Sequence, residues 1–189
     1  RRSVLEIKIK SDGKNSYRKL SKVSNSDPTK IVDFLLDSGL WSFVKQRPYD
    51  IIADPGSNPK EIYISGFDSA PLSADYDYVI AEEKKNITTA IDYLCKLTDG
   101  SVNVSLRKES KSFLRELSNI NICNVSGPHP SGNLSTIINK TSPINKGDVV
   151  WTLNLPDLVI IGNAILIGKY NPERIIAISG SSIESPKYF

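Results

Sequence analysis

The segment V-S-G-P-H-P-S-G-N-L-S-T, residues 125–136, joins an apolar strand pattern at residues 120–125 to a helix pattern that begins at Leu134. It contains His129, the only histidine of the chain, between two prolines. Each proline fixes its own φ and biases the residue before it to an extended conformation, so a stiff loop presents the imidazole. Open α/β sheets place ligands at the carboxyl ends of their strands. The segment therefore predicts a binding loop; the alternative is a rigid connector with a solvated histidine.

Two glycines bracket this loop and allow backbone turns that other residues resist. The loop also holds the chain's only side chain that ordinarily titrates near neutral pH. We expect it to lie exposed at the carboxyl edge of a sheet and to contact a ligand or a neighbouring protein. The candidate contact residues are Gly127, Pro128, His129, Pro130 and Gly132.

Strand and helix patterns alternate on either side of this loop. The period-2 or short apolar runs predict strands at residues 62–64, 102–106, 120–125, 149–153 and 174–179. Apolar 3–4 spacing with capping residues predicts helices at residues 27–38, 82–98, 110–118, 134–139 and 156–168. Residues 47–59 and 67–77 are expected to be loops. This alternation predicts an α/β fold, a mostly parallel sheet with helices on both faces.

The first 26 residues differ from the rest. Val4, Leu5, Ile7 and Ile9 alternate with charged residues as a strand, and a polar stretch rich in Ser, Lys and Asn follows. We expect residues 1–10 to be the last strand of a truncated β domain, residues 11–26 a linker, and residues 27–189 the α/β domain.

Composition excludes several classes of protein. The net charge is +3 and the basic residues are scattered, which does not indicate nucleic-acid binding. Two cysteines cannot by themselves hold an iron–sulfur cluster or an all-cysteine zinc site. The longest apolar run, residues 158–168, is too short to span a bilayer and predicts a buried helix. Trp41 and Trp151 lie in apolar surroundings, where core packing is expected.

Familiar catalytic motifs are absent from the sequence. No G-x-G-x-x-G follows a strand, and neither a G-x-x-x-x-G-K-[ST] loop nor a G-x-S-x-G elbow occurs. A Ser-His-Asp set and a zinc site built from His129 and Cys123 have no supporting motif. Asp68, Asp75 and Asp77 could hold a cation, but a solvated acidic loop is the favoured interpretation.

Four segments taken together resemble the A subunit of the bacterial Na+-translocating NADH:quinone reductases. They are G-L-W-S-F-V-K-Q-R-P-Y-D (39–50), S-A-P-L-S-A-D (69–75), G-P-H-P-S-G-N (127–133) and V-W-T-L-N-L-P-D-L-V-I-I-G (150–162). The ending R-I-I-A-I-S-G (174–180) is similar as well. Each motif is modest alone, and their order and spacing make the resemblance specific from about Arg2 to the end.

The resemblance implies a Rossmann-like domain preceded by a small biotinyl-carrier-like β domain, of which residues 4–10 would be the last strand. A β-grasp-like domain and further helices would follow Phe189. It also implies a peripheral subunit on the cytoplasmic face of the bacterial inner membrane, bound to membrane and peripheral subunits of a respiratory-chain complex. That complex couples quinone reduction to sodium export, and ubiquinone or another quinone is a candidate ligand of the 127–132 loop.

No tightly bound cofactor is expected in this chain; flavins and an iron–sulfur centre are expected in partner subunits. We expect the chain alone to be inactive. Two positions depart from the family pattern. Many members have a second histidine-containing stretch after the loop, and this chain has Thr136-Ile137-Ile138-Asn139 there. A Leu-Phe pair is common further on, and this chain has Ala164-Ile165 in its place. The alternative function is a soluble α/β enzyme or ligand-binding domain with a small-molecule site at the carboxyl edge of the sheet.

Overall fold

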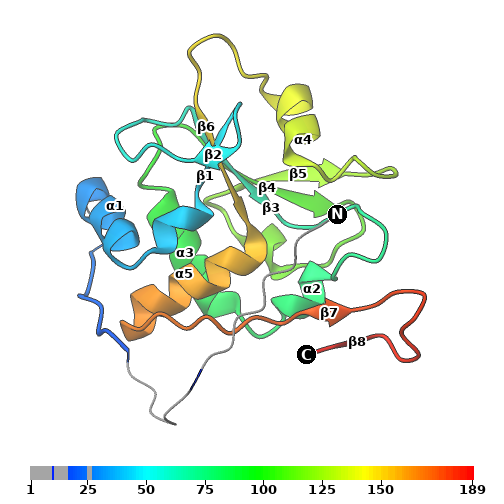
Figure 1. The fold of residues 1–189 in the computed structure, drawn as a ribbon. Coiled ribbons are helices and arrows are strands. Elements are labelled where there is room, and N and C mark those ends of the chain that lie inside the picture. The colour runs from blue at the N-terminus through cyan, green and yellow to red at the C-terminus, as the bar shows by residue number, and fades with distance from the viewer. Residues whose placement is uncertain (1–9, 11–16, 25–26) are drawn as a thin grey trace.

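A computed structural model of the chain describes residues 10, 17–24 and 27–189 (Figure 1). The strand predicted at residues 4–10 falls outside the described residues except for Lys10, and the 11–26 linker is described only in part.

The main sheet has six strands in the order β2-β1-β6-β3-β4-β5 (Figure 1). Their bounds are β1 Lys45–Arg47, β2 Ile51–Ile52, β3 Glu61–Ser65, β4 Val102–Arg107, β5 Asn121–Val125 and β6 Val150–Asn154. The strands β6, β3, β4 and β5 run parallel, whereas β1 is antiparallel to β6 and β2 is antiparallel to β1. The predicted mostly parallel sheet is confirmed. If the four parallel strands are numbered 1 to 4 in chain order, beginning with β3, their spatial order β5-β4-β3-β6 is 3-2-1-4. This is the order with which the sheet of a doubly wound fold begins.

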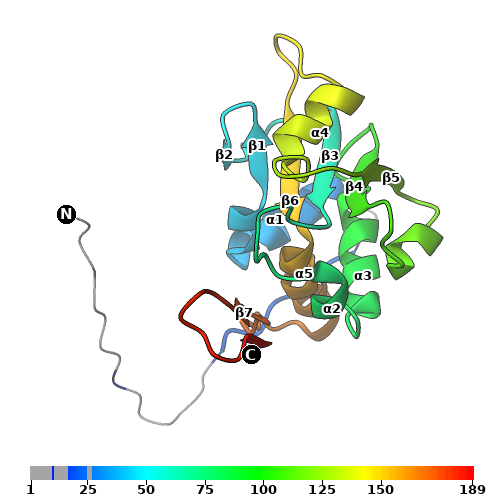
Figure 2. The ribbon, with the colours of Figure 1, turned by 90° about the vertical axis from the view of Figure 1, so that its right-hand side faces the viewer.

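Helices cover both faces of this sheet, as predicted. The α-helices are α1 Pro28–Asp37, α2 Tyr76–Val79, α3 Lys84–Leu94, α4 Leu134–Thr141 and α5 Leu155–Ile167, and two 3-10 turns lie at Leu40–Phe43 (η1) and Phe113–Glu116 (η2). On one face α3 packs against α5, and Figure 2 shows α4 well apart from both. A Cβ at Gly162 of α5 would lie 1.9 Å from the carbonyl oxygen of Asn86, so only glycine permits this close crossing.

The pleat of the strands sorts the core into two layers. Ile62, Ile64 and Leu153 point to the α3–α5 side and belong to the larger apolar cluster. Tyr63 and Val150 point the other way and pack with Leu134, Ile137 and Ile138 of α4. Successive strand residues face opposite sides of a sheet, so both layers follow from one set of strands. The strands are therefore buried on both faces, as parallel sheets are.

Trp41 packs in the core, as the sequence predicted. It is 4% exposed, and its indole N–H donates a hydrogen bond of 2.7 Å to the carbonyl oxygen of Ala53. Its ring meets that of Trp151 edge-on, with centroids 5.2 Å apart. Gly39 has φ of 77°, a left-handed conformation that ends α1 and turns the chain into η1.

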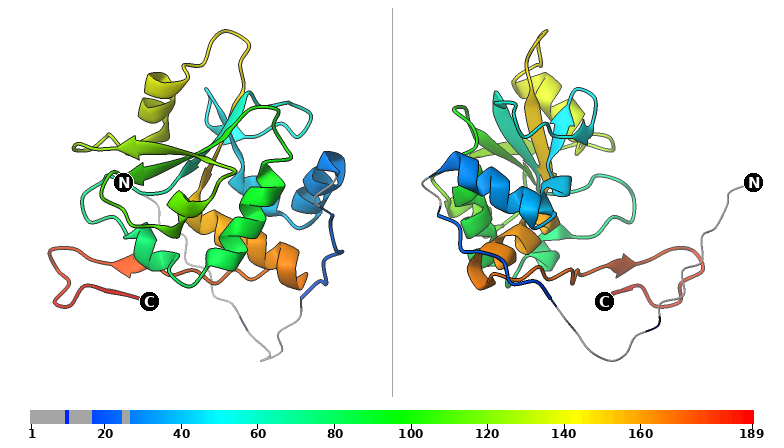
Figure 3. Two further views of the ribbon diagram at one scale, coloured as in Figure 1. Left: turned by 180° about the vertical axis from the view of Figure 1, so that it is seen from behind. Right: turned by 60° about the vertical axis from the view of Figure 1, so that its left-hand side comes forward.

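Two sequence predictions about loops and strands are wrong. Residues 47–59 are not loop throughout, because β1 and β2 form a hairpin with Lys45 opposite Ile52. A two-residue strand shows no period by which it could be predicted. The predicted last strand at 174–179 is shortened to β7 (Ala177–Ile178), which pairs with β8 (Lys187–Tyr188) in a separate antiparallel sheet. Figure 3 shows this hairpin beside α2, away from the six-stranded sheet.

The remaining helix predictions fare unequally. The helix predicted at 82–98 is confirmed as α3, with shorter bounds. The amphipathic helix predicted at 110–118 is wrong, because only the four-residue 3-10 turn η2 forms there. Asp27 caps α1 by accepting from the backbone N–H of Thr29 at 3.0 Å, as expected of an N-cap aspartate. The apolar segment 158–168 lies in α5, whose residues are mostly buried. Among the described residues, no helix combines the length and apolar character that crossing a membrane requires.

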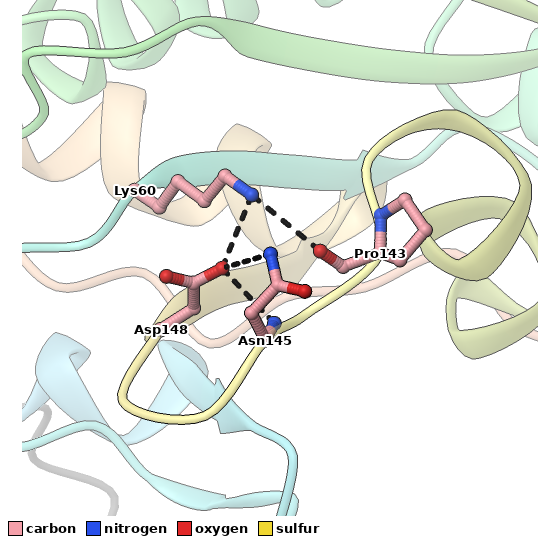
Figure 4. A network of polar contacts seen from close by, with 4 residues as sticks. All are labelled: Lys60, Pro143, Asn145 and Asp148. Carbon is pink, nitrogen blue, oxygen red and sulfur yellow. Dashed lines mark hydrogen bonds and ion pairs between the residues drawn. The ribbon is translucent and has the colours of Figure 1, made fainter.

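A polar network closes the amino end of the sheet (Figure 4). Lys60 lies just before β3. Its Nζ donates to Oδ2 of Asp148 at 3.1 Å and to the carbonyl oxygen of Pro143 at 3.4 Å. The backbone N–H of Asn145 donates to the same Asp148 oxygen at 3.0 Å. These donors lower the pKa of Asp148, the Asn145 backbone N–H most of all. The network thus ties the loop after α4 to the start of β3.

Candidate functional site

The loop that carries His129 lies at the carboxyl edge of the sheet, directly after β5. Gly127, Pro128, His129 and Pro130 are all exposed, whereas Gly132 is buried. Two hydrogen bonds within the loop stabilise it. Ser131 Oγ donates to the carbonyl oxygen of Gly127 at 2.9 Å, and the backbone N–H of Ser131 donates to the carbonyl oxygen of Pro128 at 2.9 Å. The sequence predicted this position and the exposure of residues 127–130, whereas the expected exposure of Gly132 is wrong. What the loop contacts stays a prediction.

Ser69 joins the His129 loop to the loop that follows β3. Its Oγ lies 3.1 Å from Nδ1 of His129 and accepts a hydrogen bond of 2.9 Å from the backbone N–H of Gly132. A hydroxyl has one proton and two acceptor lone pairs, so Ser69 Oγ can bond to Gly132 and to the imidazole at the same time. One serine therefore sets both the position of the loop and the orientation of the imidazole.

Gly132 makes the close approach of the two loops feasible. A Cβ at this position would lie 2.9 Å from the backbone N, the Cβ and the Oγ of Ser69. Any larger residue would have to push the loops apart. We refer to residues 69–75 and 127–132 together as the paired loops.

The C-terminal hairpin supports the paired loops from the other side. The backbone N–H of Asp75 donates to the Tyr188 hydroxyl at 2.8 Å, and Ser179 Oγ donates to the carbonyl oxygen of Leu72 at 3.4 Å. The rings of Tyr78 and Tyr188 lie 4.4 Å apart between centroids. The loop after β3 is therefore fixed at both ends, by the hairpin and by His129 with Gly132.

A cavity of about 380 Å3 opens between the loops that follow β3 and β4. Its lining includes Phe67, Tyr76 and Arg107, and the guanidinium of Arg107 lies 5.1 Å from the centre of the Phe67 ring. Burial raises the pKa of Tyr76, with smaller contributions from the carboxylates of Asp68 and Asp157. The cavity lies at the carboxyl edge of the sheet between β3 and β4, next to the point between β3 and β6 at which the strand order reverses.

An ion pair lies at the carboxyl end of β6, next to the point between β3 and β6 at which the strand order reverses. Arg174 Nη2 lies 2.7 Å from Oδ1 of Asp157, which is 6% exposed, and Asn154 Nδ2 donates to Oδ2 at 3.2 Å. The guanidinium also lies 5.2 Å from the ring centre of Phe43. Arg174 also lines a cavity of about 700 Å3, together with Tyr76 and Pro156.

The acidic loop does not assemble a metal site. Asp68 accepts from the backbone N–H of Ala70, Asp75 caps α2, and Asp77 accepts from the Ser110 hydroxyl at 2.7 Å. Over residues 10, 17–24 and 27–189, no three His, Cys, Asp or Glu side chains come together as a metal would require. The zinc site considered for His129 and Cys123 is therefore not formed by the described residues.

Both cysteines are half-buried thiols. Burial raises the pKa of Cys95 and of Cys123, and the charges of Asp92 and Glu61 respectively add to the effect. A raised pKa keeps the reactive thiolate scarce near neutral pH. The thiols thus fit packing positions better than a nucleophilic site.

Sequence reasoning missed Ser69, Tyr188 and Arg174 as parts of this site. Ser69 and Arg174 each lie in a segment that carried the resemblance, but nothing in either segment shows which residue it meets. Ser69 and His129 are 60 positions apart, and only the fold brings them together.

The amino-acid sequence of this chain matches one protein family and several curated relatives. Residues 26–170 match the family described as the NqrA second alpha/beta domain. The A subunit of the Na(+)-translocating NADH-quinone reductase of Photorhabdus laumondii is 35% identical over 153 residues, 81% of this chain and 34% of the relative. Its counterpart is 29% identical over 97% of this chain in a Marinomonas species and 33% identical over 88% in Pseudomonas aeruginosa.

These curated relatives are much longer than the chain. The alignments cover 34%, 41% and 37% of the three relatives, so the chain spans about a third to two fifths of their length. The paired loops lie wholly inside the part that matches the family.

Proposed function

Since the chain belongs to the family of the A subunits of the Na+-translocating NADH-quinone reductases, we propose that it is part of a peripheral subunit that supports quinone reduction coupled to sodium export. In this proposal the subunit lies on the cytoplasmic face of the bacterial inner membrane and docks on the membrane and peripheral subunits of the same complex. It carries no tightly bound cofactor; flavins and an iron–sulfur centre belong to the partner subunits.

The observation that carries the proposal is the pairing of the loops through Ser69. The pairing holds an exposed imidazole in one orientation on a backbone stiffened by two prolines. Stiffness of this kind lowers the ordering cost of binding, whereas a connector gains little from it. We propose that the paired loops contact quinone or a neighbouring subunit, and that His129 is the central contact.

The nature of the crevice supports the absence of a nucleotide cofactor. A dinucleotide requires a tight glycine turn that leads from the first strand directly into a helix N-terminus. Here residues 66–83, including the short helix α2, separate β3 from α3. We therefore expect no micromolar NADH binding by the chain alone in titration calorimetry, and measured binding at that level would contradict this part of the proposal.

The test of the site uses His129→Ala and Ser69→Ala in the assembled reductase. We expect either change to slow quinone reduction or to weaken retention of the chain on the complex. The melting temperature of the chain should stay nearly unchanged for His129→Ala, because His129 is exposed. It should fall modestly for Ser69→Ala, because the backbone N–H of Gly132 loses its acceptor. Lys85→Ala, an exposed change on α3, is the matched control. A variant that melts far lower, with full activity per assembled complex, would show that the histidine is structural.

The cavity between the loops after β3 and β4 favours a second candidate function, a small-molecule site of an α/β enzyme or binding domain. Its volume of about 380 Å3 lies within the range of about 300–1,000 Å3 typical of ligand sites. The visible absorption spectrum of the purified chain separates the two proposals. Co-purifying flavin absorption would favour the second candidate and count against the first.

A further inference from the structure

The turn of the β1–β2 hairpin exposes three large apolar side chains. Tyr49 in the turn is 79% exposed, and Ile51 and Ile52, which make up β2, are each 53% exposed. β2 is an edge strand of the six-stranded sheet and carries no charged residue. Edge strands of native proteins usually carry charges that discourage further contacts, so the apolar end of this hairpin indicates an interaction surface. We refer to residues 48–52 as the hairpin tip.

The apolar side chains of the hairpin tip point to both faces of the sheet. Consecutive residues of a strand face opposite sides, so the side chains of Ile51 and Ile52 diverge. Their cross-strand neighbours on β1 are Gln46 and Lys45, respectively. A flat protein surface can cover only one face of such a strand, whereas a fluid surface into which the tip inserts surrounds both faces. The equal exposure of the two isoleucines therefore favours insertion into a lipid surface.

The hairpin tip lies at the amino end of the central strands, away from the paired loops. β1 runs antiparallel to β6, with Arg47 opposite Val150, the first residue of β6. The loop after α4 enters β6 at this same point, and Ile144 of that loop lines a small cavity together with Arg47. The hairpin tip and the loop at 142–149 thus share one end of the molecule (Figure 1).

The charges at this end leave an excess of free cations. Segments 45–54 and 140–148 together hold four basic and three acidic residues. Two of the acidic residues are already paired, Asp50 with Arg47 and Asp148 with Lys60. The three lysines of these segments have no ion pair within the described part of the chain; they are Lys45, Lys140 and Lys146. Three unpaired lysines therefore surround the hairpin tip, against one unpaired carboxylate, that of Asp54.

We propose that the hairpin tip inserts into the headgroup region of an anionic lipid bilayer and so orients the subunit on the membrane. The inference rests on the proposed location of the chain at a membrane. Tyrosine is enriched where membranes meet water, which suits Tyr49, and the two isoleucines contact the apolar boundary below the headgroups. The unpaired lysines attract the anionic lipids around the tip.

This orientation also bears on the paired loops. They lie at the carboxyl end of the strands, whereas the hairpin tip lies at the amino end. With the tip in the bilayer, the loop of His129 faces away from the membrane. The orientation therefore favours a neighbouring subunit over quinone as the contact of the paired loops.

The hairpin tip alone should bind vesicles weakly. It presents less apolar surface than one myristoyl chain, which binds membranes with an association constant of about 10⁴ M⁻¹. We expect the purified chain to be half-bound at about 1 mM lipid, in vesicles of phosphatidylglycerol and phosphatidylethanolamine. Each lysine near an anionic surface adds about a fivefold factor, equivalent to about 1 kcal/mol. Neutral phosphatidylcholine vesicles should therefore bind the chain at least about tenfold more weakly.

The double change Ile51→Ser/Ile52→Ser tests the apolar contact in vesicle flotation. Removing both side chains should weaken binding to the anionic vesicles about tenfold or more. The melting temperature should stay nearly unchanged, because both positions are exposed. Leu166→Ser/Ile167→Ser, at neighbouring residues of α5 that are 40% and 59% exposed, is the matched control and should bind as the parent does.

The double change Lys140→Glu/Lys146→Glu tests the charge. Two lysines at about fivefold each give a loss of at least about 25-fold in binding to the anionic vesicles. Lys108→Glu/Lys111→Glu has the same net charge at exposed positions after β4 and should weaken binding far less. Raising the salt from about 0.1 M to about 1 M, which shortens the Debye length from about 10 Å to about 3 Å, should weaken the parent strongly.

Three results would overturn the proposal. The first is an absence of binding to the anionic vesicles at about 10 mM lipid, well above the expected midpoint. The second is equal binding to phosphatidylcholine vesicles. The third is full vesicle binding by Ile51→Ser/Ile52→Ser; if this variant instead leaves the assembled reductase more readily, the hairpin tip docks on a protein. None of these results touches the proposed function, which His129→Ala tests in the assembled reductase.

Discussion

Arg174 reaches back from the C-terminal segment to Asp157 in the first turn of α5, with Nη2 and Oδ1 2.7 Å apart. The carboxylate is buried at the switch point of the sheet, whereas the arginine side chain is 40% exposed. This pair links the segment after α5 to the end of β6, which holds Asn154. It lies beside the point at which the strand order of the sheet reverses.

Arg174→Met should destabilise the chain by roughly 3 kcal/mol. The substitution leaves the buried Asp157 without its cation, and breaking a buried pair costs about 3–5 kcal/mol, with the low end expected here because Arg174 is partly exposed. Urea unfolding followed by circular dichroism measures the change. The control is Arg18→Met, which removes an exposed ion pair with Asp37 and should cost at most about 1 kcal/mol. Equal effects of the two changes would contradict the special role of the buried pair.

Trp41→Ala should lower the free energy of unfolding by roughly 3–5 kcal/mol, typical of truncating a buried aromatic. It removes the edge-on contact with Trp151 and the hydrogen bond to Ala53. Chemical denaturation gives the magnitude, and the emission of the two tryptophans should be that of buried indoles. Tyr49→Ala, at a ring that is 79% exposed, is the control and should be nearly neutral. Emission typical of water-exposed indoles in the native chain would disprove the burial.

Gly132→Ala should destabilise the paired loops, because its methyl group would lie 2.9 Å from Ser69. Overpacking of this kind costs typically about 1–3 kcal/mol. Amide hydrogen exchange should rise in residues 127–133, and the melting temperature should fall. Gly56→Ala, whose Cβ would meet only Asp54 Oδ1 at 3.5 Å, is the matched control. If exchange in the loop stayed at its native rate, the close approach would not hold the loops together.

Tyr63 makes the alkaline stability of the chain sensitive to pH. Burial raises its pKa from 10.0 to about 12, although the Thr141 hydrogen bond acts in the opposite direction. The unfolded tyrosine loses its proton near pH 10, while the folded one keeps it, so this contribution is complete below about pH 10 and is lost as the pH rises through about 12.

Tyr63→Phe should therefore flatten the loss of stability between about pH 10 and 12. Melting temperatures across that range measure the effect. Tyr49→Phe, an exchange at an exposed ring, should leave the alkaline slope of the parent chain intact. A Tyr63→Phe slope as steep as that of the parent would assign the effect to other groups.

The sequence alone predicted the helices and strands whose signals are local. The helix α3 repeats apolar residues at 3–4 spacing, α1 begins with Asp27-Pro28, and α5 ends at Gly168 with φ of 67°. Such patterns follow from the helix period and from capping. The position of the His129 loop was predictable for the same reason, since a strand pattern precedes it and a helix pattern follows.

The contacts that complete the site depend on topology. Ser69 meets His129 because β3 and β5 end at the same edge of the sheet, one strand apart, and no local pattern shows this. The hairpin of β1 and β2 was missed because Ile51 and Ile52 are too few to show a period. The C-terminal pairing of β7 with β8 was missed because the strand prediction assumed that every strand joins one sheet.

Hydrogen bonds from the loop after β3 connect the C-terminal hairpin to the histidine loop. Tyr188 holds Asp75 at one end of that loop, and Ser69 holds His129 at the other. Order gained at one end reduces the freedom left to be lost at the other, so ordering of the two ends is coupled. By linkage the influence is reciprocal. A protein that docked on the C-terminal hairpin would thereby also restrict the motion of the histidine loop without touching it.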